Sequence, residues 1–197
     1  MLTDSMNQTQ TTERRSDVTY AVSDTGPLIS AFQSDSFGLL CRIFPNIYVP
    51  QVCVAELQTH GWQETVDALS PPLVCVQLTE EEELRSLVIA DEIARHSGTR
   101  DPNRGHHLGE AQAIVLAGRS DHQNAVLLID ERIPRQVARQ RGMRLSGFPG
   151  VLLLATQAGL ISPEELRLRL ESCRAQGTHY GISLIQQVFE MAQRNWR

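Results

Sequence analysis

The chain has 197 residues, 41% of them hydrophobic, which is enough for one compact domain with its own core. Its net charge of −5 at pH 7 argues against a protein that coats nucleic acid through bulk charge. All 18 basic side chains are arginine, whose guanidinium group suits phosphate. No apolar run reaches the roughly 18 residues of a membrane span, and no signal-length apolar stretch follows Arg14 and Arg15. We therefore expect a cytoplasmic protein that makes no use of a membrane.

Residues 1–17 are rich in Thr, Gln, Asn and Ser, so we expect a disordered tail at this end of the chain. After the tail, short apolar segments alternate with helical patterns. In chain order we expect a strand at 20–23, helices at 27–32 and 37–44, a strand at 47–49, helices at 50–57 and 62–69, a strand at 73–78, a helix at 80–95, a loop at 97–107, a helix at 108–118, a strand at 125–129, a helix at 132–141 and a strand at 144–146.

Beyond residue 147 the pattern is helical only, with expected helices at 149–158, 163–175 and 182–194. The alternation of strand and helix predicts an α/β fold with a parallel sheet covered on both faces. We expect one domain over residues 18–147 and a helical extension over 148–197 that packs on the same domain. The four cysteines show no CxxC spacing and have apolar neighbours, so we expect buried, reduced thiols and no zinc site: Cys41, Cys53, Cys75 and Cys173.

Four separated carboxylates are the most informative feature. Asp24 and Asp130 each close an apolar strand, and Glu56 and Glu110 lie on helices that begin beside strand ends. The carboxyl ends of parallel strands meet at one edge of a sheet, where open α/β folds bind ligands. Because like charges in one pocket raise each other's pKa, we expect a divalent cation there, and oxygen ligands favour Mg²⁺ or Mn²⁺. Such an ion can support hydrolysis of a phosphodiester.

Alternatives remain open for all four carboxylates. Asp24 could cap the helix that follows it, Glu56 could face solvent, and Glu110 could be favoured by the dipole of its own helix. Asp130 is followed directly by Glu131, which leaves open which of the two faces the site, although the strand end favours Asp130.

Arginines gather near the expected site. Arg132, Arg135 and Arg139 share one helix face, which could hold phosphates or could be an ordinary solvated face. Arg104 lies in the loop before Glu110 and could line a nucleic-acid path.

Other residues in and beyond that loop carry weaker signals. His106 and His107 could line the RNA path or act as a lid, but paired histidines in such a loop are usually unliganded, so we expect no metal at either. Aromatic residues make up only 5% of the chain, so we expect Tyr180 and Trp196 to serve packing or to be disordered.

Four segments resemble the PIN-domain superfamily and occur in that family's order: Val22–Ile29, Val49–Glu56, Leu108–Ile114 and Leu128–Arg132. The later stretch Ser146–Ile161 resembles the C-terminal part of a VapC-like prokaryotic subgroup. The resemblance implies a Rossmann-like three-layer α/β/α sandwich and Mg²⁺- or Mn²⁺-dependent cleavage of single-stranded RNA.

The family's acidic positions fall on the four carboxylates named above, as metal ligands and catalytic residues: Asp24, Glu56, Glu110 and Asp130. Thr25 matches a position whose hydroxyl supports the site. Many relatives are toxins that a small antitoxin protein holds inactive, and many form homodimers, so the resemblance implies both kinds of partner.

Two other functions compete with this one. The chain could be a weak or inactive PIN-like module that binds RNA or a partner protein without cutting. A phosphatase with a nucleophilic aspartate is disfavoured, because Gly26 stands where such sites carry a second aspartate and the chain has no lysine.

Overall fold

The computed structural model describes residues 20–62 and 72–196. The expected disordered tail at 1–17 and all but the first residue of the expected helix at 62–69 lie outside the described residues.

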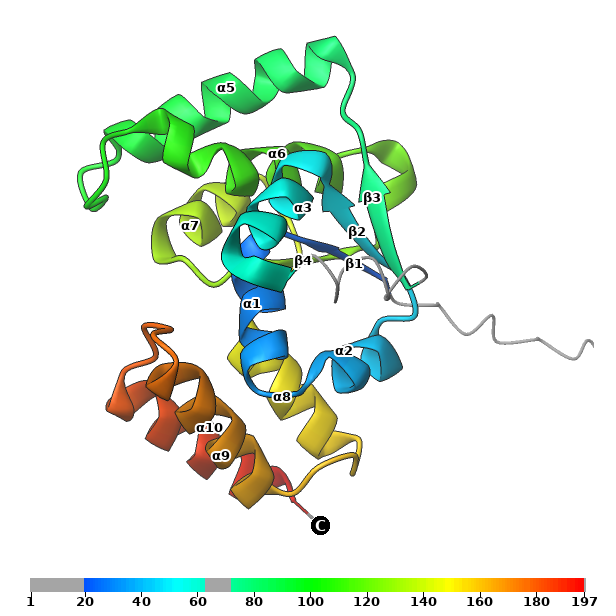
Figure 1. Cartoon of the computed structure of the whole chain (residues 1–197), viewed down its shortest axis with the longest axis vertical. Coiled ribbons are helices and arrows are strands. Elements are labelled where there is room, and N and C mark those ends of the chain that lie inside the picture. The colour runs from blue at the N-terminus through cyan, green and yellow to red at the C-terminus, as the bar shows by residue number, and fades with distance from the viewer. Residues whose placement is uncertain (1–19, 63–71, 197) are drawn as a thin grey trace, which may run out of the picture.

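Within these ranges, five parallel strands form one sheet in the order β3-β2-β1-β4-β5 (Figure 1). The strands are β1 (Ala21–Ser23), β2 (Ile47–Pro50), β3 (Leu73–Val76), β4 (Val126–Leu128) and β5 (Leu145–Ser146). Ala21 of β1 pairs with Ile47 of β2 on one side and with Val126 of β4 on the other. The chain runs outward from β1 in one direction to β3 and then in the other to β5. The topological switch point, where such sheets bind ligands, therefore lies between β1 and β4.

The helices begin and end close to the positions that the sequence predicts. They are α1 (Thr25–Gln33), α2 (Phe37–Ile43), α3 (Gln51–Leu57), α5 (Glu80–Arg95), α6 (Leu108–Ala117), α7 (Arg132–Gln140), α8 (Phe148–Gln157), α9 (Pro163–Ala175) and α10 (Ile182–Asn195). A π-helical turn, η1 (Gln58–Trp62), continues α3, and a 3₁₀ turn, η2 (Arg104–His107), leads into α6. A second 3₁₀ turn, η3 (Ser120–His122), follows α6.

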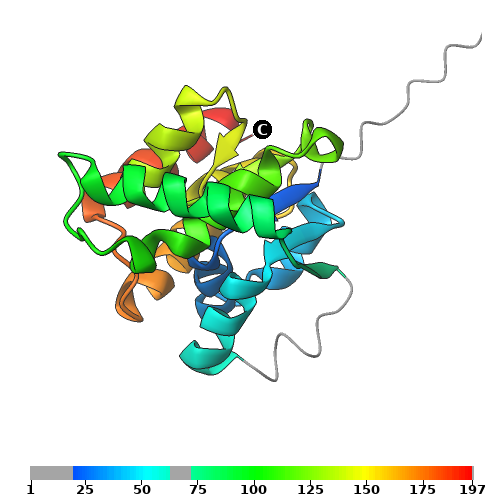
Figure 2. The same ribbon diagram turned by 90° about the horizontal axis from the view of Figure 1, so that it is seen from above.

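The side chains of the central strand alternate between two cores, because successive residues of a strand point to opposite faces. Ala21 joins a core built with α1, α2, α8, α9 and α10, and Val22 joins one built with α5, α6 and α7. Figures 1 and 2 show these helix groups on opposite sides of the sheet. The expected three-layer α/β/α sandwich is confirmed. Helices α9 and α10 lie side by side and extend the first layer.

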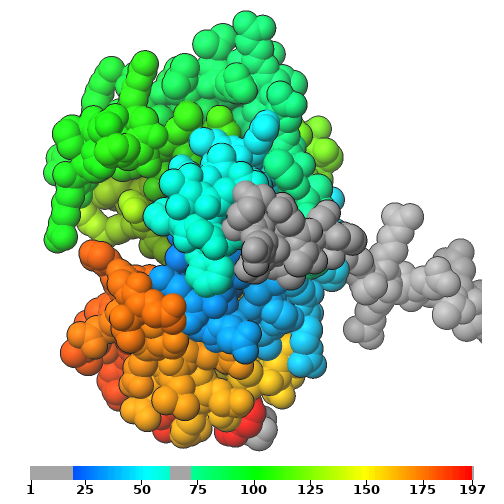
Figure 3. All heavy atoms as spheres, viewed as in Figure 1, coloured from blue at the N-terminus to red at the C-terminus, as the bar shows by residue number. Residues whose placement is uncertain are grey.

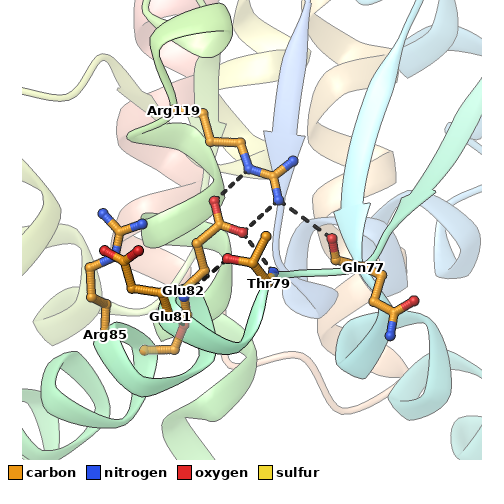
Figure 4. A network of polar contacts seen from close by, with 7 residues as sticks. Gln77, Thr79, Glu81, Glu82, Arg85 and Arg119 are labelled. Carbon is orange, nitrogen blue, oxygen red and sulfur yellow. Dashed lines mark hydrogen bonds and ion pairs between the residues drawn. The ribbon is translucent and has the colours of Figure 1, made fainter.

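The start of α5 is fixed by a capping box in which Thr79 and Glu82 each bond the other's backbone N–H (Figure 4). The Glu82 carboxylate also accepts two hydrogen bonds from the Arg119 guanidinium, at 2.8 and 2.7 Å. These bonds with Arg119, helped by Thr79, lower the pKa of Glu82 to about 2. The acidic first turn of α5 is therefore structural, and it joins the β3–α5 junction to the segment that follows α6.

The cysteines only partly match the expectation from the sequence. Cys53 and Cys173 are buried and Cys41 is half-buried, but Cys75 is exposed. The expectation is wrong for Cys75 because it lies on β3, an edge strand with no described strand beyond it. All four are free thiols among the described residues. None of the described helices has both the length and the apolar character needed to cross a lipid bilayer.

Candidate functional site

Asp24 directly follows β1, and its backbone N–H donates to Leu128 O of the neighbouring strand at 3.2 Å. It occupies the N-cap position of α1, but its side chain makes no capping hydrogen bond, so helix capping does not explain this residue. Asp24 is only 4% exposed, and its Oδ1 has no hydrogen-bond partner among the described residues. A buried carboxylate oxygen without a partner is costly, and a cation can supply what it lacks.

The other predicted carboxylates lie around Asp24. Burial, and then the charges of Glu110, Asp130, Glu131 and Glu56, raise the pKa of Asp24 well above its ordinary value. Both members of the adjacent pair at 130 and 131 therefore act on Asp24, whereas the sequence favoured only the first.

The position of Gly26 shows that Asp24 and Asp130 lie close to each other. A Cβ atom placed on Gly26 would lie 3.9 Å from both Asp24 Oδ1 and the Cβ of Asp130. The ends of β1 and β4 thus bring their two aspartates to the same point, at the switch point of the sheet.

Glu56 points inward from α3, as the sequence predicts, and is half-buried. The hydroxyl of Thr25, at the start of α1, donates a short hydrogen bond to Glu56 Oε2. Gly109 lets α6 approach Glu56, because a Cβ atom at that position would lie only 3.3 and 3.4 Å from its two carboxylate oxygens. Thr25 and Gly109 therefore fix where this carboxylate lies.

Glu110 lies in the first turn of α6 and is only 9% exposed. Burial raises its pKa to about 8, with smaller contributions from Glu131, Glu56 and Asp101 and an opposing one from its own backbone N–H. Single ligand atoms of His107, Glu110 and Glu131 all lie within 4.8 Å of one another. No other set of three acidic, histidine or cysteine side chains among residues 20–62 and 72–196 is that close. No three of the four predicted carboxylates are as close to one another as His107, Glu110 and Glu131 are. The four lie around one edge of the sheet in a looser arrangement.

Both oxygens of Asp130 are held by hydrogen bonds. Oδ1 accepts from the backbone N–H of Phe148 at 2.8 Å, and Oδ2 accepts from the hydroxyl of Tyr180 at 2.7 Å. Burial raises the pKa of Asp130, while Tyr180, Phe148 and Arg135 oppose that rise. A Cβ atom on Gly147 would lie 2.5 Å from Oδ1, so only glycine fits beside this carboxylate.

The role of Tyr180 differs from the one expected from the sequence. Its side chain is buried, and its hydroxyl also lies 2.8 Å from Ser30 Oγ. Tyr180 is therefore ordered, and beyond packing it donates a hydrogen bond into the candidate site. Its place in the sequence, 50 residues after Asp130, gives no signal of this contact.

The predicted arginines do not act as one group. Arg135 is half-buried and donates to Ile129 O at 2.8 Å, which keeps it beside Asp130. Arg132 and Arg139 are exposed on α7, and Arg104 forms an exposed ion pair with Asp91 at 3.7 Å. The guanidinium groups of Arg132 and Arg139 can therefore contact a ligand. Arg135 instead helps to hold the structure around Asp130.

In the space-filling view a recess lies between the green segment before α6 and the orange segment between α9 and α10 (Figure 3).

The acids that face the switch point, and the unpartnered oxygen of Asp24, fit a divalent cation with oxygen ligands. An arrangement of this kind can support hydrolysis of a phosphate ester.

A family model described as DUF3368, a PIN domain, matches residues 20–194. This range contains the four predicted carboxylates, Glu131 and Tyr180. No curated protein matches the chain.

Proposed function

Because this chain belongs to the DUF3368 family of PIN domains, a nuclease fold, we propose that it is a Mg²⁺- or Mn²⁺-dependent endoribonuclease that cleaves single-stranded RNA. The observation that carries the proposal is Asp24, which is buried among acids and has an oxygen without a partner. A structural carboxylate would have a capping or ion-pair partner at this position, and Asp24 has neither among the described residues.

In this proposal the ion is held by the four carboxylates that the sequence singled out: Asp24, Glu56, Glu110 and Asp130. A bound divalent cation supplies Lewis acidity and a water of lowered pKa. The protein positions its ligands in advance. The hydroxyl of Thr25 fixes Glu56, and Phe148 N and Tyr180 fix the two oxygens of Asp130. Little reorganisation is then needed when substrate arrives.

The substrate proposal rests on charge near the site. Arg132 and Arg139 are exposed on α7, which begins directly after Glu131 and so lies beside the acids. Guanidinium groups suit phosphate oxygens and can hold the backbone on either side of the scissile bond.

We further propose that the chain is the toxin of a toxin–antitoxin pair, that a small antitoxin protein holds it inactive, and that it forms a homodimer. The support is the resemblance of Ser146–Ile161 to VapC-like proteins. If a short reading frame lies beside this gene, its product should copurify with the chain and stop RNA cleavage. Copurification without inhibition would contradict this part of the proposal.

The nuclease proposal is tested with purified protein and end-labelled RNA. We expect internal cleavage of a single-stranded RNA in Mg²⁺ or Mn²⁺, none in EDTA, and slower cleavage of the same sequence as a duplex. RNA that is bound but left intact in both metals would contradict the proposal and favour the non-cutting module.

A further inference from the structure

His107 is a buried histidine with one ring nitrogen in use and one free. It is 5% exposed, and its Nε2 lies 2.8 Å from the backbone oxygen of Asp101. A carbonyl oxygen can only accept, so Nε2 carries the proton. Nδ1 has no hydrogen-bond partner among the described residues, and in the neutral ring it presents a lone pair.

His107 belongs to a cluster with two carboxylates. One ring nitrogen of His107, one oxygen of Glu110 and one oxygen of Glu131 all lie within 4.8 Å of one another. Because Nε2 is bound to Asp101 O and Nδ1 has no partner among the described residues, we assign Nδ1 as the nitrogen that would bind a cation. Glu110 is buried and Glu131 is exposed, so the cluster opens to solvent on one side. Among the described residues no hydrogen bond joins these three side chains, so a bound cation would satisfy the free nitrogen and neutralise both carboxylates.

The chain holds His107 in the way that metal-binding histidines are held. Such residues usually donate their second ring N–H to a backbone carbonyl or a carboxylate, which fixes the tautomer and the ring orientation. In this chain the backbone oxygen of Asp101 is the acceptor. Asp101 is itself fixed, because its Oδ1 accepts from Asn103 N at 2.9 Å and its Oδ2 lies 2.6 Å from His106 Nδ1. The loop before α6 is thus braced around His107.

We propose that His107 Nδ1, Glu110 and Glu131 form a second divalent-cation site, and that its nitrogen ligand makes it prefer Mn²⁺ to Mg²⁺. Imidazole suits transition-metal ions, whereas Mg²⁺ prefers oxygen ligands throughout. The two cation sites share Glu110 as a ligand. In this respect alone, the inference rests on the proposed function. The protein then holds one ion among oxygen ligands and a second ion that also has a nitrogen ligand.

The test uses Mn²⁺ itself as the probe and does not depend on RNA cleavage. Pulsed electron paramagnetic resonance detects the ¹⁴N nucleus of an imidazole bound to Mn²⁺. We expect ¹⁴N modulation in the full-length protein, its loss in His107→Gln, and its retention in His106→Gln, which changes the neighbouring exposed histidine. No modulation in the unaltered protein, or loss in His106→Gln alone, would overturn the proposal.

A second measurement uses an exposed ligand, so that folding is not at risk. In calorimetric titrations we expect two Mn²⁺ binding events, and Mg²⁺ should compete effectively for only one of them. Loss of an outer-shell partner already lowers metal affinity by about 10- to 100-fold, so Glu131→Gln, which removes a direct ligand, should weaken the other event by about 10-fold or more. A single binding event, or equal competition by Mg²⁺ at both, would contradict the proposal. Protein that binds two ions in this manner but leaves RNA intact would refute the proposed function and leave this inference standing.

Discussion

The hydroxyl of Tyr180 lies 2.7 Å from Oδ2 of Asp130, so the connection between α9 and α10 completes the hydrogen bonding of a carboxylate at the end of β4. The same hydroxyl lies 2.8 Å from Ser30 Oγ on α1. The C-terminal helices therefore do more than cover one face of the sheet, because they help to orient a proposed metal ligand.

Replacing this hydroxyl should weaken the site without unfolding it. A hydrogen bond to a charged group contributes about 1.5–3 kcal/mol, so we expect Tyr180→Phe to reduce RNA cleavage by about 10-fold or more. Because the Tyr180 bond lowers the pKa of Asp130, its loss should also move the acid limb of the pH–rate profile to higher pH. Ser30→Ala, which leaves the bond to Asp130 in place, should have a much smaller effect. A Tyr180→Phe variant with unchanged rate and pH profile would exclude this role.

Gly147→Ala should displace Asp130. The new methyl group would lie 2.5 Å from Asp130 Oδ1 and 2.8 Å from the Nη1 atom of Arg135, both well inside van der Waals contact. We expect Mn²⁺ affinity and cleavage to fall together, with a loss of stability of about 1–3 kcal/mol from overpacking. Gly38→Ala is the matched control, since a Cβ atom there meets nothing within 4 Å and alanine favours the helix. Equal behaviour of the two variants in calorimetry and in the cleavage assay would contradict the steric argument.

The ion pair between Glu82 and Arg119 should stabilise the fold and leave the chemistry unchanged. Arg119→Met removes both hydrogen bonds to a buried carboxylate, and we expect a loss of about 1–3 kcal/mol in urea unfolding. Arg85→Ala breaks an exposed contact of 4.0 Å with Glu81, so it should change stability by less than about 0.5 kcal/mol. If Arg119→Met has the same free energy of unfolding as Arg85→Ala, the ion pair between Glu82 and Arg119 does not stabilise the fold.

The same ion pair predicts how stability falls in acid. The pKa of Glu82 is about 2 in the folded protein and 4.5 ordinarily, so its contribution is present above pH 4.5 and is lost as the pH falls towards 2. The unfolding free energy of Arg119→Met should therefore approach that of the unaltered protein in acid. A difference that stays constant over this range would argue against the assigned cause.

The acids of the candidate site predict the opposite dependence on pH. Burial raises the pKa of Asp24 and Asp130, and that of Glu110 to about 8, so the metal-free fold binds more protons than the unfolded chain. Its stability should be greatest below the ordinary values of these groups and should fall as the pH rises through about 8.

Thermal melting in EDTA and in Mn²⁺ checks this dependence. Because a metal binds the deprotonated ligands, Mn²⁺ should raise the melting temperature most at the alkaline end. Glu110→Gln should flatten the slope in EDTA. A melting temperature in EDTA that does not change between about pH 5 and about pH 8 would contradict the assigned pKa shifts.

Much of the fold could be predicted from the sequence because its signals are local. Apolar runs closed by Asp24 and Asp130 mark the two strands at the switch point, and Thr79 with Glu82 marks the start of α5. Local patterns also place Glu56 on the inward side of α3, since its neighbours in the chain are apolar.

Contacts between distant segments could not be predicted in this way. Nothing in the spacing shows that Tyr180 returns to Asp130, because that depends on how α9 and α10 pack. His107 looked like an ordinary loop histidine, since its free nitrogen is defined only once the Asp101 carbonyl binds the other. Cys75 looked buried, because a pattern of apolar neighbours does not show which strand ends up at the edge of the sheet.

The central claim is that Asp24 is a metal ligand of a ribonuclease, and single-turnover cleavage of a single-stranded RNA by Asp24→Asn in Mn²⁺ tests it most directly. The substitution keeps the shape of the side chain and removes a buried carboxyl group whose ionised form is disfavoured in the metal-free fold, so the variant should melt at the same temperature as the unaltered protein in EDTA, or higher. We expect its cleavage rate to fall by at least about 100-fold, the effect of about 2.7 kcal/mol of lost transition-state stabilisation. A folded Asp24→Asn protein that cleaves the RNA at the unaltered rate would contradict the account.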